Sequence, residues 1–107
     1  RDFAPRGTVL SIGPLTLDIL KREIAASGVL LPLTTREFEI LEYLMLHADK
    51  IVSQEELLGH IWESDANPFS HAVRVHISSL RKKLRDVLGY DPIQTKIGRG
   101  YCLEVNP

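Results

Sequence analysis

The sequence predicts a single α+β domain in which a four-stranded antiparallel sheet precedes three helices and a final β-hairpin. Short runs rich in Val, Ile, Leu and Thr, separated by Gly and Pro, occupy residues 8–33. At Thr34 the hydrophobic period changes from that of a strand to that of a helix, and two more strand-like runs follow residue 88. The 107 residues, with 44% hydrophobic and 25% charged side chains, are typical of one globular domain.

The composition and the distribution of charge along the chain exclude some kinds of site and favour others. The chain has neither an apolar run of membrane-spanning length nor a signal peptide, so we expect a cytoplasmic protein. Its one cysteine, Cys102, allows no intrachain disulfide and no cysteine-based metal site. Residues 1–70 hold 6 Lys and Arg against 11 Asp and Glu, whereas residues 71–107 hold 7 against 3. An anion-binding surface is therefore expected in the last third of the chain.

The strand-rich segment is interpreted as four short strands with the sequences TVLSI, LTLDIL, REIAAS and VLLPL. Turns are expected at Gly13-Pro14, near Leu20-Lys21 and at Ser27-Gly28. No catalytic or ligand-binding motif lies there. The sheet is predicted to be a structural platform or a surface that meets an upstream domain.

Two capping boxes predict the first two helices. In Thr34-Thr35-Arg36-Glu37 the first hydroxyl accepts the N3 amide and the Glu carboxylate accepts the cap amide, and residues 53–56, Ser-Gln-Glu-Glu, repeat the pattern. Apolar residues then follow at helical spacing, so we expect helices ending near His47 and near Glu63. These residues are Phe38, Leu41, Leu44 and Met45 in the first helix, and Leu57, Leu58, Ile61 and Trp62 in the second.

Residues 70–88, SHAVRVHISSLRKKLRDVL, predict a longer amphipathic helix with a basic face. At about 100° per residue, one stripe is apolar and a second stripe, about a quarter-turn away, is rich in Arg. The apolar stripe holds Val73, Ile77, Leu80, Leu84 and Leu88, and the second holds Arg74, Ser78, Arg81 and Arg85, flanked by His71, Val75 and Lys82. Gly89 and Pro92 predict the end of the helix. One face suits a core, and the other suits an anion or water.

The connections complete the arrangement. Residues 64–69, which include Asp65, Asn67 and Pro68, favour a loop, so a short helix, a loop and the basic helix form a helix-turn-helix with a long connection. Residues 93–105, IQTKIGRGYCLEV, predict two strands around Gly98-Arg99-Gly100. This hairpin has a basic tip.

Three stretches in this order and spacing resemble the winged helix-turn-helix effector domain of OmpR/PhoB-type response regulators in two-component signalling. They are LTTREFEILEYLMLHADKIVSQEELLGHIW, HAVRVHISSLRKKL and IQTKIGRGY. The resemblance covers residues 8–105, which are predicted to be the winged-helix domain. Because the chain starts with Arg1 and not Met, residues 1–7 are expected to be a linker or tail from a missing upstream domain.

The resemblance implies sequence-specific binding to double-stranded DNA, with residues 70–88 in the major groove and the wing, residues 94–102, at the minor groove. A major groove admits an α-helix, and Arg can donate two hydrogen bonds to a guanine edge. We assign base reading to His71, Arg74, Val75 and Ser78, with Val75 placed to touch a thymine methyl. The resemblance also implies a receiver domain upstream, control by phosphorylation, and a homodimer or tandem pair on direct-repeat sites.

Phosphate contacts would fix the register on DNA and provide salt-dependent affinity. The predicted phosphate-contacting residues are Thr34, Thr35, Gln54, Trp62, Arg81, Lys82, Arg85 and Tyr101. Three of these have a structural alternative. Trp62 and Tyr101 would instead only pack, and Arg81 would pair with a carboxylate, for which the acidic residues 1–70 provide candidates.

Two departures from the family pattern concern particular contacts. Gln54 stands where many members have Arg, which leaves only a neutral phosphate contact. Ile97 stands where many members have Arg in the wing, so insertion of a cation into a narrow minor groove falls to Lys96 or Arg99. We expect a weaker or displaced wing contact.

The loop after the second helix has two possible roles, and two other function classes are possible for the chain. The resemblance implies that the loop with Glu63, Asp65 and Asn67 can face RNA polymerase, and the alternative is a solvated connector. An enzyme is not expected, because His47, His60, His71 and His76 occur without an HExxH motif, paired Cys or a Gly-rich phosphate loop, and no cofactor is implied. The remaining alternative is a winged helix that binds another protein, with little dependence on salt.

Overall fold

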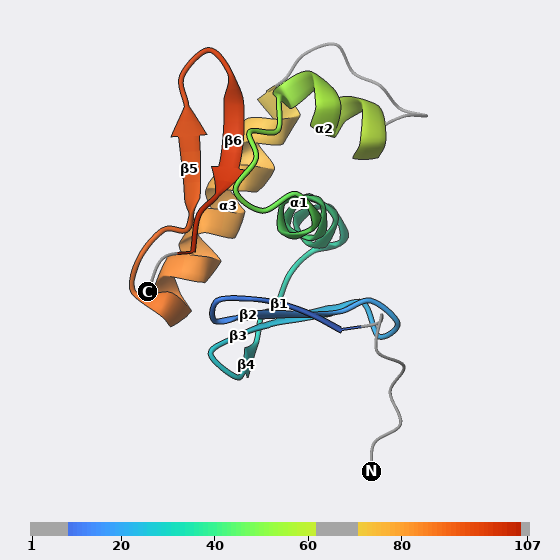
Figure 1. Ribbon diagram of the computed structural model, residues 1–107, viewed down its shortest axis with the longest axis vertical. Helices are drawn as coiled ribbons and strands as arrows, with labels where there is room; N and C mark the ends of the chain where they lie inside the picture. The colour runs from blue at the N-terminus through green and yellow to red at the C-terminus, as the bar shows by residue number, and fades with distance from the viewer. Residues whose placement is uncertain (1–8, 62–70, 106–107) are drawn as a thin grey trace.

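The computed structural model describes residues 9–61 and 71–105, without the side chains of His71 and Ala72. Its elements are β1 (Val9–Ile12), β2 (Leu15–Asp18), β3 (Glu23–Ala26), β4 (Val29–Leu30), α1 (Thr35–Leu46), α2 (Gln54–Ile61), α3 (His71–Leu88), β5 (Ile93–Lys96) and β6 (Gly100–Leu103). This order confirms the predicted α+β fold (Figure 1). The predicted linker 1–7, the predicted end of α2 near Glu63 and the loop with Asp65 and Asn67 lie outside the described residues.

The first four strands form an antiparallel meander in the order β1-β2-β3-β4. One face is apolar, because Leu15 and Leu17 of β2 and Ile24 of β3 are almost fully buried. The predicted strands are longer than the observed ones. LTLDIL, for example, ends at Asp18, whose carboxylate accepts the amide of Lys21 at 3.0 Å and so closes the turn.

Side chains cap the first two helices, but among the described residues the complete capping box that the sequence predicts for both helices forms only at α1. The Thr34 hydroxyl accepts the Glu37 amide at 3.2 Å, and the Glu37 carboxylate accepts the Thr34 amide at 2.9 Å. At α2 the Ser53 hydroxyl accepts the Glu56 amide at 3.0 Å. The Glu56 carboxylate accepts a hydrogen bond from the Tyr43 hydroxyl, which joins α2 to α1.

The apolar stripe of α3 forms the centre of the core. Val73, Ile77, Leu80 and Leu84 are at most 1% exposed, and they belong to one cluster with residues of α1, the four-stranded sheet and the hairpin. Burial of each such side chain contributes about 1.5 to 3 kcal/mol. Leu88 lies at the edge of the cluster, and the amide of Gly89 donates to the carbonyl of Arg85 at 2.9 Å, which ends the helix where predicted.

The C-terminal hairpin, or wing, is attached to the loop before α2. Tyr101 of β6 exchanges two backbone hydrogen bonds with Val52, at 2.7 and 2.8 Å. Gly100 makes this approach possible, because a Cβ atom at this position would lie 2.1 Å from the carbonyl oxygen of Val52. Gly100 therefore begins β6 and lies outside the turn where the sequence placed it; the turn is residues 97–99.

The elements are arranged so that the wing tip and the start of α3 share one end of the molecule. In Figure 1 the four-stranded sheet lies at the opposite end, with α1 between the sheet and α2, while the C-terminal end of α3 reaches the sheet. The free side of α3 at the wing end is therefore not covered by the sheet.

Candidate functional site

Three of the four predicted base-reading residues, Arg74, Val75 and Ser78, lie on the face of α3 that is turned away from the core. Arg74 and Ser78 are exposed, and Val75 exposes half of its surface. Val73 and Ile77, on the same turns of the helix, are buried. The division of α3 into a core face and a free face is confirmed for these residues. His71 begins the helix, but its side chain is outside the described part of the structure.

A shallow depression of about 450 Å³ lies between α3 and the wing. Its lining residues are Gln54, Arg74, Ile77, Ser78, Arg81, Thr95, Ile97, Gly98 and Tyr101. A second depression of about 250 Å³ adjoins the start of α2, and its lining includes Glu55, Lys96 and Arg99. Three separate elements, α2, α3 and the wing, thus contribute residues to one continuous surface. The two depressions share Gln54, Thr95, Gly98 and Tyr101.

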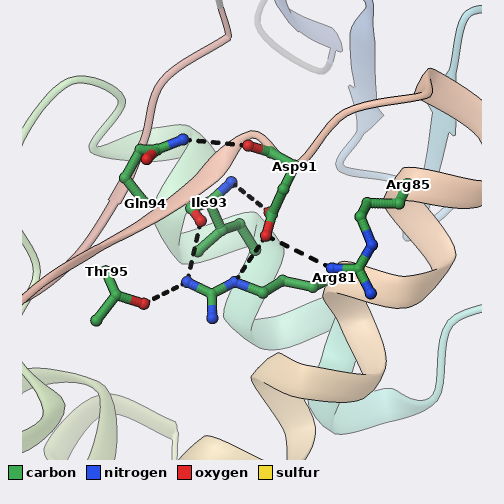
Figure 2. A network of polar contacts seen from close by, with 6 residues as sticks. All are labelled: Arg81, Arg85, Asp91, Ile93, Gln94 and Thr95. Carbon is green, nitrogen blue, oxygen red and sulfur yellow. Dashed lines mark hydrogen bonds and ion pairs between the residues drawn. The ribbon is translucent and has the colours of Figure 1, made fainter.

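Arg81 joins α3 to the wing. Its Nη2 atom donates to the carbonyl oxygen of Ile93 at 3.0 Å and to the hydroxyl of Thr95, both on β5 (Figure 2). Its Nε atom lies 3.2 Å from a carboxylate oxygen of Asp91, close enough for an ion pair but out of line for a hydrogen bond. Arg81 thus has the structural role, pairing with a carboxylate, that was the alternative to a phosphate contact.

The carboxylate partner of Arg81 was expected among residues 1–70, and that expectation is wrong. Asp91 lies beyond the end of α3, and its carboxylate is also 3.7 Å from Nη1 of Arg85. The same carboxylate accepts the amide of Ile93 at 3.1 Å, so it holds the start of β5 as well (Figure 2). The sequence signal that was available is an Asp directly before Pro, ten residues after Arg81, but it does not by itself identify the partner.

The remaining basic residues of α3 are more exposed. Lys82 and Arg85 expose 73% and 51% of their side chains. Lys82 forms a surface ion pair with Asp86, one turn along the helix, at a distance of 3.7 Å. Such exposed pairs contribute little to stability, so Lys82 can turn toward an anion at small cost.

The predicted contacts at helix starts and in the wing differ in accessibility. Thr34 and Thr35 are exposed at the start of α1. Gln54, at the start of α2, donates to the Tyr101 hydroxyl at 3.3 Å, and Tyr101 is only 5% exposed. Tyr101 therefore packs into the hydrophobic core between the wing and α2. Trp62 lies outside the described residues.

The two cations of the wing lie in different surroundings. The Lys96 ammonium lies 3.1 Å from the carboxylate of Glu104, after the end of β6. Arg99 is exposed in the turn, beside Ile97, which is 91% exposed. The tip thus combines a cation with an apolar side chain.

A buried polar cluster that the sequence reading missed links α3 to the start of α1. Glu37 is 2% exposed, and its carboxylate accepts hydrogen bonds from Ser79 and Lys83 of α3. Lys83 also donates to the carbonyl of Pro32 at 2.8 Å. Burial works to raise the pKa of Glu37, but the bonds from Lys83, Ser79 and the Thr34 amide outweigh it and lower that pKa. The spacing of Ser79 and Lys83, one helical turn apart, was the available signal.

The histidines and the cysteine form no recognisable reactive centre in the described ranges. His47 and His60 both lie against the ring of Tyr43, with centroids 4.3 and 4.5 Å away. Burial raises the pKa of the Cys102 thiol. Within residues 9–61 and 71–105, no three His, Cys, Asp or Glu side chains are grouped to hold a metal ion, and no helix could span a membrane.

Comparison with known proteins identifies the family. The family described as "Transcriptional regulatory protein, C terminal" matches residues 28–103. The response regulator PhoP of Pseudomonas aeruginosa is 33% identical over 94 residues, which are 88% of this chain and 42% of that protein. The regulatory protein CutR of Streptomyces coelicolor is 35% identical over 94% of this chain and 45% of its own length. The chain thus spans less than half of these relatives.

Solved structures agree. The DNA-binding domain of Klebsiella pneumoniae RstA, crystallised with the RstA box, superposes with a TM-score of 0.78 and 32% identity over 90% of this chain and 96% of that one. The DNA-binding domain of Escherichia coli CpxR superposes with a TM-score of 0.77 and is 36% identical in sequence, over 90% of this chain and 95% of that one. The chain belongs to the OmpR/PhoB-type family of C-terminal domains of transcriptional regulatory proteins, as its sequence motifs predict.

Proposed function

We propose that this chain binds double-stranded DNA sequence-specifically, as the effector domain of a response-regulator transcription factor. The free face of α3, with Arg74, Val75 and Ser78 exposed above a buried apolar stripe, carries the proposal. A helix presented in this way fits the major groove of B-DNA, where Arg pairs with guanine and an apolar group contacts the thymine methyl. His71, at the start of the same helix, is assigned to base reading with them.

The phosphate contacts are assigned to groups around this face. Lys82 and Arg85 extend the basic stripe, while Thr34 and Thr35 stand at the start of α1, where free amides and the helix dipole favour an anion. Gln54 supplies a neutral donor at the start of α2. For Arg81 and Tyr101 the proposed phosphate contact is secondary to their packing and pairing in the wing, and for Trp62 it rests on the sequence alone.

The wing is proposed to reach the minor groove next to the α3 site. Support comes from the depression that α3 and the wing share, from Arg99 in the exposed turn, and from Lys96 at the end of β5. The related RstA domain was crystallised with its DNA box. This supports DNA as the partner over a protein partner, which was the alternative.

The partners of the whole protein are proposed from its relatives. Two-component response regulators such as PhoP are more than twice as long as the matched region, which leaves room for a receiver domain that controls the effector. We propose binding as a tandem pair on direct repeats. The RNA polymerase contact through Glu63, Asp65 and Asn67 remains a proposal from the sequence.

Titration onto duplex DNA at several salt concentrations tests the function. Because each neutralised phosphate releases counterions, log K should fall linearly with log salt, with a slope of about −0.9 for each phosphate contacted. Selection of bound duplexes from a random pool should then yield one preferred sequence. Failure to bind at low salt, or binding that does not respond to salt, would contradict the proposal and favour the protein-interaction alternative.

A further inference from the structure

The tip of the wing presents an isoleucine to solvent. Ile97 is 91% exposed, against 69% for Leu20, the next most exposed large apolar side chain in the described chain. One exposed apolar residue is ordinary on a protein surface, so exposure alone assigns no role. Its position is more informative, because Ile97 lines the same depression as Arg74 and Ser78 of the free face of α3.

Both strands of the wing are held in place, so the position of this tip relative to α3 is defined. Arg81 of α3 donates to the β5 backbone and to Thr95, two residues before Ile97 (Figure 2). On the other strand, Tyr101 pairs through its backbone with Val52. A helix seated in the major groove would therefore carry Ile97 to one particular place along the DNA.

The charges around Ile97 favour DNA as the surface that covers it. Arg99 is exposed in the same turn, so the tip itself is cationic. Lys96, which precedes Ile97, has its ammonium 3.1 Å from the carboxylate of Glu104. This pair holds the Lys96 charge toward the base of the hairpin. The apolar side chain thus lies in a turn that also carries an exposed cation, and it lines a depression shared with the proposed base-reading face.

We propose that Ile97 is a specificity-determining residue, which packs into the minor groove beside the α3 site and selects an A·T over a G·C pair there. The inference rests on the proposed function. Both base pairs present acceptors in the minor groove, but only G·C adds the 2-amino group of guanine. The isoleucine side chain offers no hydrogen-bond acceptor to this 2-amino group, which would lose its bond to water. The 2-amino group also occupies the space that the side chain would fill. Proteins do use apolar side chains against minor-groove base steps.

Base analogues test this mechanism on a duplex that holds a single half-site. Inosine·C removes the 2-amino group from a G·C pair, and 2-aminoadenine·T adds it to an A·T pair, while each keeps the major-groove edge of its parent. At the wing position we expect A·T and inosine·C to bind alike. G·C and 2-aminoadenine·T should bind about five- to ten-fold more weakly.

Two variants of the same turn separate the apolar contact from the charge. Ile97→Ala should abolish the discrimination at that pair and leave the salt dependence unchanged, and it should fold normally because Ile97 is 91% exposed. Arg99→Gln is the matched variant. It should lower the salt slope by about 1 and keep the discrimination.

The outcomes distinguish this inference from the proposed function. If the unaltered chain does not bind DNA, the proposed function is wrong. If it binds with a preference that depends on Arg74, yet Ile97→Ala has the same base preferences at all positions, the inference about Ile97 is wrong. It is also overturned if inosine·C behaves as G·C does, or if Ile97→Ala alters binding only on tandem sites, which would place Ile97 between two copies.

Discussion

Nε of Arg81 and the carboxylate of Asp91 lie 3.2 Å apart, and this ion pair connects the third helix to the loop that leads into the wing. The side chains are only 23% and 30% exposed, so water screens the pair incompletely. The Asp91 carboxylate also accepts the amide of Ile93. It therefore connects the start of β5 to Arg81 of α3. Asp91, which belongs to neither α3 nor the wing, thus adds to the direct bonds from Arg81 that orient the wing against α3.

Replacement of Asp91 by Asn should destabilise the fold modestly. The change leaves the half-buried Arg81 guanidinium without its counter-charge, which we expect to lower the free energy of unfolding by about 1 kcal/mol. Urea denaturation measures this. Asp86→Asn is the control, because Asp86 is 65% exposed and its ion pair with Lys82 lies at the surface. Equal effects of the two substitutions would show that the Asp91 pair has no special structural role.

Gly100→Ala should detach the wing from the loop before α2. A Cβ atom at residue 100 would lie 2.1 Å from the Val52 carbonyl oxygen, and φ of +143° is unfavourable for alanine. Loss of the two backbone bonds to Val52 and the strained conformation together suggest about 2 to 4 kcal/mol of destabilisation. Gly98→Ala is the matched control. Its φ is also positive, but no atom crowds the new methyl, so about 1 kcal/mol is expected.

Urea denaturation of the two alanine variants gives the comparison. If Gly100→Ala were no more destabilising than Gly98→Ala, the close approach of the wing to Val52 would not hold in solution.

The cluster around Glu37 predicts a pH dependence of stability. The pKa of Glu37 is lower in the folded chain than its ordinary value of 4.5, so the folded state binds this proton less tightly than the unfolded state does. Its contribution to stability is therefore complete above about pH 4.5 and is lost as the pH falls through the folded pKa. The stability difference between the unaltered chain and Glu37→Gln should shrink on acidification below about pH 4.5.

Denaturation at a series of pH values measures that difference, and Glu55→Gln at an exposed position of α2 serves as the control. A difference for Glu37→Gln that stays constant from neutral to acidic pH would contradict the assignment. Lys83→Met should cost about 2 to 3 kcal/mol at neutral pH, because it leaves a buried carboxylate without its cation. The double variant should be less destabilised than the two single losses added together.

Local sequence signals predicted the elements, whereas contacts between distant residues had to come from the structure. The capping box at Thr34 and the stripe from Val73 to Leu84 are set by spacings of three and four residues, which a sequence displays directly. The partner of Arg81 is different. Whether a carboxylate of the first 70 residues or Asp91 reaches it depends on how the loop after α3 turns back. The burial of Glu37 beneath Ser79 likewise depends on how α1 and α3 pack.

Arg74→Ala and Lys82→Ala should separate base reading from phosphate binding on the same helix. Arg74 lies on the free face of α3 near its start and lines the depression beside the wing, whereas Lys82 lies two turns farther along and is 73% exposed. If Arg74 contacts a guanine edge, its loss should relax the preference at one base pair by about 1 to 3 kcal/mol. Lys82→Ala should weaken all sequences about equally and reduce the salt slope by about 1, because a phosphate is present at every step. Selection from random duplexes measures the first effect and titration at several salt concentrations the second. If the ranking of sites were unchanged for Arg74→Ala, Arg74 would not be a base-reading residue. If the loss of affinity for Lys82→Ala depended on the DNA sequence, Lys82 would contact a base and not only a phosphate.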